Sequence, residues 1–137
     1  MPIVAFIIIG AVCITIATEV ARRRRLAPLL ARPCAGREWR RSFAAVPKSE
    51  IREFLKLFVE AFGLRGKHCL AFRPNDRIMD VYRAMYPPKW TAVDDMELEY
   101  FALLLKERYT LDLTSNWRDD LTLGEIFSRT VPIIPPG

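Results

Sequence analysis

The side chains that most enzymes use for chemistry are scarce in this sequence of 137 residues. His68 is the only histidine, and no serine or cysteine nucleophile can be assembled with it and an orienting acid. A glycine-rich phosphate loop, a Gly-x-Ser-x-Gly turn and the ligand spacing of a zinc site are also absent. These absences argue against an enzyme, and we predict no catalytic residue, no cofactor and no metal site.

Cysteine is scarce as well. The chain has Cys13, Cys34 and Cys69, and their spacing fits neither a metal site nor an even-numbered disulfide framework. We therefore interpret all three as free thiols in a reducing compartment.

Positive charge is unevenly distributed along the chain, whose overall net charge is +5. Residues 1–48 hold nine basic and two acidic residues, a net charge of +7, whereas residues 49–137 carry a net charge of −2. The basic character therefore belongs to the N-terminal segment. This split weakens a nucleic-acid-binding interpretation based on overall charge, and we consider nucleic acid an unlikely partner.

Residues 1–18 form an uncharged, strongly apolar run. A membrane-spanning helix needs about 17–25 such residues, and the run reaches residue 21 if Glu19 lies at the interface. Arg22–Arg25 follow at once, and no basic residue precedes the run, which is the reverse of the order in a cleavable signal peptide. We predict a single-pass membrane anchor at 1–21, with the N-terminus outside and the soluble domain cytoplasmic. A cleaved signal and a buried core helix are the alternatives.

Residues 22–48 contain prolines, Gly36 and further arginines, which predicts a basic juxtamembrane linker. Anionic headgroups attract such a segment by about 1 kcal/mol per basic residue near the surface. The predicted membrane-surface residues are Arg22, Arg23, Arg24, Arg25, Arg37, Trp39, Arg40 and Arg41. Membrane lipids are therefore expected partners, and a lipid- or nucleic-acid-binding module that uses this linker is an alternative function.

Residues 49–131 are predicted to form an all-α bundle of three to four helices, because no segment shows the period-two alternation of a strand. Apolar residues recur at spacings of three and four from Ile51 to Phe62, which predicts a helix with one broad buried face. Ser49 is its expected N-cap, and Gly63 its expected stop.

Three further helices are predicted, at residues 77–85, about 94–109 and 122–130. Asp76 is the expected cap of the first. Asp94 with Glu97, and Thr122 with Glu125, have the spacing of capping boxes for the other two. The residues expected on the buried side of the second are Met96, Phe101, Leu104, Leu105 and Tyr109. The tail 132–137 is rich in proline and is expected to be extended.

The helix predicted from Asp94 has a distinctive opening and ending. Asp94-Asp95-Met96 stands at its start, Tyr109 lies fourteen residues after Asp95, and Leu113 lies eighteen after it. This segment resembles the second helix of acyl carrier proteins, which opens with Asp-Ser-Leu and has an aromatic and an aliphatic residue at those spacings. The resemblance covers roughly 49–131, with an additional short helix before Asp94.

The chain departs from the carrier pattern at Asp95, which stands where the family has its serine. The family's serine hydroxyl receives phosphopantetheine, and a carboxylate cannot accept the same stable linkage. The resemblance therefore implies a carrier fold without carrier chemistry. A working acyl or peptidyl carrier with an unrecognised attachment site is the alternative.

The acidic opening of this helix is also a candidate protein-docking edge. Its residues are Asp94, Asp95, Met96, Glu97 and Glu99. Helix capping uses the same carboxylates, and a metal site would need convergent oxygens from more than one element. Carrier proteins present such a helix to basic partner surfaces, so the resemblance implies an interaction with a protein. We predict a non-catalytic, membrane-tethered interaction module.

Overall fold

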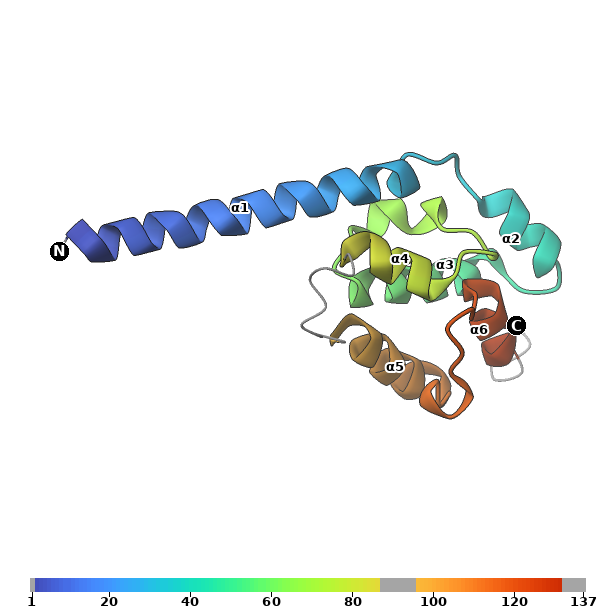
Figure 1. Cartoon of the computed structure of the whole chain (residues 1–137). Coiled ribbons are helices and arrows are strands. Elements are labelled where there is room, and N and C mark those ends of the chain that lie inside the picture. The colour runs from blue at the N-terminus through green and yellow to red at the C-terminus, as the bar shows by residue number, and fades with distance from the viewer. Residues whose placement is uncertain (1, 87–95, 132–137) are drawn as a thin grey trace.

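The computed structural model describes residues 2–86 and 96–131, and their regular structure is helical (Figure 1). The helices are α1 (Pro2–Leu30), α2 (Gly36–Ser42), α3 (Lys48–Ala61), α4 (Ile78–Met85), α5 (Met96–Tyr109) and α6 (Leu123–Thr130), with short 3-10 helices η1 (Gly66–Ala71) and η3 (Thr114–Asn116). An isolated antiparallel β-bridge between Arg77 and Thr122 is the only strand-like pairing among the described residues. The all-α prediction is confirmed at this level.

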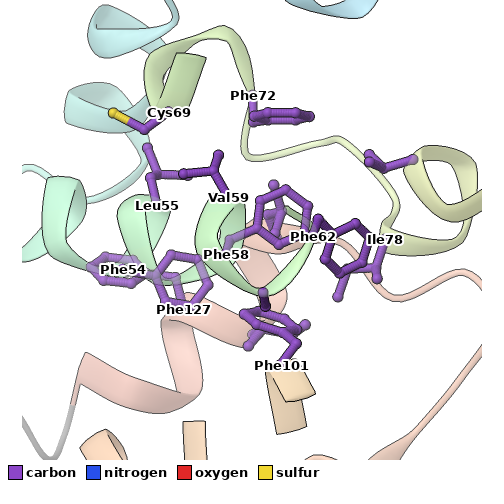
Figure 2. Packing of buried hydrophobic residues seen from close by; sticks show 14 of the residues in the cluster. Phe54, Leu55, Phe58, Val59, Phe62, Cys69, Phe72, Ile78, Phe101 and Phe127 are labelled. Carbon is purple, nitrogen blue, oxygen red and sulfur yellow. The ribbon is translucent and has the colours of Figure 1, made fainter. Parts of the chain in front are cut away.

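The central helix of the core is α3, which buries the apolar face predicted from its spacing. The aromatic rings of α3 meet rings from other elements, with centroids 5.1 Å apart for Phe54 and Phe127 and 5.4 Å apart for Phe58 and Phe101. Figure 2 shows the side chains of α3 directed at these rings and at Phe72. Because burying one such side chain contributes roughly 1.5–3 kcal/mol, this cluster is the main source of stability.

The two ends of α3 differ in how well the sequence predicts them. The predicted N-cap at Ser49 is wrong, because the helix begins at Lys48 after Pro47 and no side chain caps it. Gly63 has a φ of +67°, a left-handed conformation that glycine adopts without steric cost, and it ends the helix as predicted.

The starts of α4 and α6 are joined to each other. The amide of Ile78 donates to the carbonyl of Leu121 at 3.1 Å, and the amide of Leu123 donates to the carbonyl of Asp76 at 3.0 Å. Amides at helix starts lack partners within their own helix, so each segment satisfies an amide of the other. The carboxylate of Asp76 does not cap α4, contrary to the prediction, and bonds elsewhere.

The capping box predicted at the start of α6 is present. The amide of Glu125 donates to the hydroxyl of Thr122, and the Thr122 amide donates to the Glu125 carboxylate. Gly124 lies against the loop before α4, and a Cβ placed there would be 2.9 Å from the carbonyl oxygen of Pro74. Only glycine fits this contact without a shift of the backbone.

The segment 22–48, predicted to be a linker, is helical for much of its length. The helix α1 continues through the arginine cluster and through Pro28 to Leu30, and α2 supplies a second helix. Proline inside a helix removes one hydrogen bond and costs about 3 kcal/mol. Burial of Leu26 offsets this cost, with Leu29 and Leu30 packed around it on the core.

The N-terminal part of α1 projects away from the rest of the protein (Figure 1). Every residue from Pro2 to Thr18 is exposed. The whole helix of 29 residues is about 43 Å long, at about 1.5 Å per residue. It is long and apolar enough to cross a membrane, and this length and composition also fit a signal sequence.

Candidate membrane-surface and docking sites

The arginine cluster after the apolar run divides into two pairs. Arg25 faces the core, where its Nε and Nη2 donate to the carbonyl oxygens of Ala84 and Met85 at 2.9 and 3.0 Å. These carbonyls belong to the last turn of α4, the negative end of its dipole, so the cation is favourable there. Arg25 therefore joins α1 to α4.

Arg22 lies on the same face of α1, beside the C-terminal end of α3. Its Nη1 is 4.0 Å from the position that a Cβ would take at Gly63. Its Nε is buried and has no hydrogen-bond partner among the described residues. The Glu19 carboxylate lies 3.4 Å from this Nε, close enough for an ion pair but without hydrogen-bond geometry. The guanidinium of Arg22 is therefore incompletely satisfied.

The other pair, Arg23 and Arg24, points to solvent. Arg23 donates from Nε to the second carboxylate oxygen of Glu19 at 3.1 Å. This pair, unlike Arg22 and Arg25, is placed as the prediction of a membrane-surface patch requires.

Arg32 was not selected in the sequence analysis, yet it makes the most extensive polar contacts of the N-terminal segment. Its Nη1 and Nη2 donate to the two carboxylate oxygens of Asp76 at 2.9 and 2.6 Å, and Nη2 also donates to the carbonyl of Ala71. The hydrogen bond with Asp76 raises the pKa of Arg32 above its usual value. Both side chains are largely covered, so the pair fixes the chain after α1 to the start of α4.

The prediction that Trp39 lies on the membrane surface is wrong. Its side chain is fully buried, its indole N–H donates to the carbonyl of Phe72 at 2.8 Å, and its ring packs against Phe43, Phe54 and Phe127. Its place in the core explains why α2 is held against α3. An aromatic residue among arginines resembles an interfacial patch in sequence, but here it belongs to the interior.

The remaining arginines of α2, Arg37, Arg40 and Arg41, are exposed. Figure 1 shows α2 at the end of the molecule opposite the N-terminus of α1. If α1 crosses a bilayer, α2 therefore lies on the side of the domain away from it. We accordingly retain Arg23 and Arg24, and not the arginines of α2, as the exposed membrane-surface candidates.

The predicted docking edge at the start of α5 is described in part. Asp94 and Asp95 lie outside the described residues. Glu99 is exposed, whereas Glu97 is half-buried and accepts a hydrogen bond from the hydroxyl of Tyr86. Glu97 thus links α5 to the end of α4, and Glu99 faces solvent among the described carboxylates of this edge.

The outer face of α5 carries exposed apolar side chains, which the sequence analysis assigned differently. Met96 was expected to be buried, but it is 64% exposed, followed by Tyr100 at 40% and Leu103 at 51%. The opposite face buries Phe101 and Leu105, as predicted. The helix is therefore apolar on two faces. The sequence indicates this second face, because the segment has more apolar residues than a single buried stripe of a helix needs.

A groove lies beside this outer face. It has a volume of about 340 Å³. Its lining residues are Leu98, Glu99, Ala102, Leu113, Thr114 and Trp117. The groove extends the apolar surface of α5 toward η3, so that an incoming side chain would meet apolar walls beside one carboxylate.

The residues at the carrier-like positions at the end of α5 and shortly after it pack in the core. Tyr109 is buried near Phe54, with ring centroids 6.4 Å apart, and Leu113 is also buried. Burial raises the pKa of Tyr109 to about 12, and its hydroxyl has no hydrogen-bond partner among the described residues. These positions are structural in this chain.

A larger cavity lies where α1 meets the end of α4, with a volume of about 600 Å³. The described residues that line it are Ile14, Ala17, Thr18, Glu19, Ala21, Arg22, Arg25, Met85 and Tyr86. It therefore brings the inward pair of arginines together with the last part of the apolar run. Nothing in the linear sequence indicates it, because Met85 and Tyr86 lie more than fifty residues after the end of α1.

The described parts of the chain contain no group of three or more His, Cys, Asp or Glu residues that could hold a metal ion. His68 is half-buried in η1, beside the buried Cys69. Cys13 and Cys34 are exposed, and all three thiols are unpaired.

No protein-family model matches the chain, and no curated protein or solved structure matches it at a significant level. The resemblance to acyl carrier proteins thus rests on the order of the helices and on the spacing of residues 94–113. It stays a prediction about ancestry and fold.

Proposed function

We propose that this protein is a non-catalytic, single-pass membrane protein whose cytoplasmic, acyl-carrier-like domain binds a protein partner. The orientation is supported by Arg23 and Arg24, which are exposed directly after the apolar run, because cytoplasmic flanks carry an excess of basic residues. Attachment to one membrane would raise the effective concentration of the domain near any partner in that membrane. Binding can then be weak in solution and still be efficient at the membrane.

The exposed apolar face of α5, formed by Met96, Tyr100 and Leu103, carries this proposal. A helix on a protein surface usually has one apolar stripe and an opposite polar face. An additional apolar stripe bordered by a groove is typical of an interaction site. Each of these side chains would contribute roughly 1–3 kcal/mol if a partner covered it fully.

Charge around this face indicates the chemistry of the partner. Glu99 borders the stripe and the groove, and Glu60 of α3 lies near it, with its carboxylate 3.5 Å from the hydroxyl of Tyr100. Both glutamates are exposed. We therefore expect a membrane-associated protein that presents an apolar patch bordered by Lys and Arg, since complementary charge favours encounter and specificity.

Site-specific photo-crosslinking in membranes of the cells that make the protein tests this proposal. A photoreactive residue in place of Leu103 should give a discrete crosslinked species, and one in place of the exposed Ser128 on α6 should not. Glu99→Lys should reduce the yield at position 103 by about fivefold, because a like charge then faces a basic border. Asp120→Lys, an equal charge change at an exposed residue that does not line the groove, is the control. Equal yields from positions 103 and 128 would contradict the proposal.

A measurement of the intact mass of the protein distinguishes this function from that of a working carrier. We expect the intact mass of the full chain to stay unchanged after incubation with a phosphopantetheinyl transferase and coenzyme A. A gain of one phosphopantetheine would overturn the non-carrier assignment. It would also locate the attachment site, once the modified peptide is sequenced.

A further inference from the structure

The cavity between α1 and the end of α4 is placed where a membrane boundary would fall. The lining residues on α1 run from Ile14, inside the apolar run, to Arg25 beyond it. This is a rise of about 16 Å at about 1.5 Å per residue. One end of the cavity thus lies at the depth of acyl chains and the other at the depth of headgroups.

The walls of the cavity change from apolar to polar along α1, in the direction from Ile14 to Arg25. Ile14, Ala17 and Ala21 of α1 and the side chain of Met85 make the apolar part. The polar end has Arg22 and Arg25, with Thr18 and Glu19 nearby. Apolar walls below two guanidinium groups match a molecule that is apolar at one end and anionic at the other.

The charges at the polar end leave a cationic excess. Glu19 is the carboxylate among the described lining residues, and its second oxygen is bonded to Arg23 on the outer side of α1. Arg25 directs Nε and Nη2 at the carbonyls of α4. The buried Nε of Arg22 has no hydrogen-bond acceptor among the described residues, and an unsatisfied buried donor costs about 1–3 kcal/mol. The Nε itself is covered, but an anionic group in the cavity would still interact favourably with the charge of this guanidinium.

We propose that this cavity binds one phospholipid with a net negative headgroup. The headgroup phosphate lies against Arg22 and Arg25, and the upper part of an acyl chain lies along Ala17 and Ile14. The proposal rests on the proposed insertion of α1 into a membrane. The bilayer supplies the ligand directly at the open side of the cavity, so the lipid does not have to leave the membrane to bind. Its function is to seal the junction between α1 and α4.

The test uses the full chain reconstituted in nanodiscs of phosphatidylcholine with a minor fraction of phosphatidylglycerol. Native mass spectrometry counts the phosphatidylglycerol molecules that remain bound after release from the disc. We expect one to be retained by the wild type. Arg22→Gln should reduce its apparent affinity about fivefold, as expected for loss of one basic residue near a headgroup. Ala17→Trp, which fills the apolar part, should reduce retention while all charges stay in place.

Arg37→Gln is the matched control, because it removes the same charge from an exposed position on α2, at the end of the molecule away from the N-terminus of α1. Equal losses from Arg22→Gln and Arg37→Gln would show a general effect of net charge and would overturn the proposal. Displacement of the lipid by inorganic phosphate alone would also overturn it, by showing that a free anion satisfies the site. Failure of the wild type to enter the nanodiscs would instead refute the membrane insertion on which both proposals rest.

Discussion

The two halves of α1 are parts of one continuous helix, yet they are adapted to different surroundings. From Pro2 to Thr18 every residue is exposed, and the side chains are almost all apolar. From Arg22 to Leu30 the helix packs on α4 and η1, with Leu26 buried in the core. The comparison shows that the apolar run and the domain are joined by packing, and not by a flexible linker.

Within the second half, helical periodicity separates structural arginines from exposed ones. Arg22 and Arg25 share the face of Leu26 and Leu29, at spacings of three and four. Arg23 and Arg24 fall on the other side. Four consecutive arginines therefore have two different tasks, and variants that change one member of each pair test the division directly.

The largest effect is expected where the segment after α1 enters the core. Trp39→Ala should lower the free energy of unfolding by about 3–5 kcal/mol, because it leaves a large cavity and an unpaired carbonyl at Phe72. Arg40→Ala, on the exposed side of α2, should change it by less than about 0.5 kcal/mol. Urea denaturation of the full chain in detergent, followed by circular dichroism, measures both. Equal effects would mean that this segment is not part of the core.

A smaller effect is expected at Arg32, the residue after α1 that pairs with Asp76. Arg32→Ala should lower the free energy of unfolding by about 2 kcal/mol. The largely covered carboxylate of Asp76 would then keep only the amide of Arg73 as a hydrogen-bond partner among the described residues. The same denaturation experiment applies. Arg37→Ala removes an equal charge from an exposed position and is expected to be nearly neutral. A neutral Arg32→Ala would show that the pair does not hold the segment in place.

The smallest of these effects concerns the inward arginines. Arg25→Gln should lower stability by about 1 kcal/mol, because a neutral amide replaces a charged donor to two carbonyls at the end of α4. Arg24→Gln should have little effect. Amide hydrogen exchange in α4 should accelerate in the first variant and not in the second. If the two variants behave alike, the division of the cluster is refuted.

Much of the helical bundle could be predicted from local patterns. The apolar spacing in α3, the positive φ at Gly63 and the capping box at Thr122 depend on residues within a few positions of one another. The burial of Phe101, Leu105 and Tyr109 in α5 was predicted for the same reason. Patterns of this kind need no knowledge of the tertiary structure.

The errors arise where distant contacts override local signals. Pro28 suggested a linker, but packing of the surrounding leucines keeps the helix intact. Trp39 was read as interfacial because of its arginine neighbours, whereas its partner Phe72 is 33 residues away. Asp76 was assigned to a cap, but Arg32 binds its carboxylate across 44 residues of sequence. The exposure of Met96 and the presence of the cavity lined by Met85 likewise depend on which helices pack together.

The unbroken course of α1 through Pro28 has a mechanical consequence. Spanning helices tilt to adapt to bilayer thickness, by about 20° on average. For a helix of about 43 Å, such a tilt displaces one end sideways by about 15 Å relative to the other. If α1 spans a bilayer as proposed, the whole domain would rotate with it, because α1 has no break before the core. A thinner or thicker membrane would then change which surface of the domain its neighbours encounter.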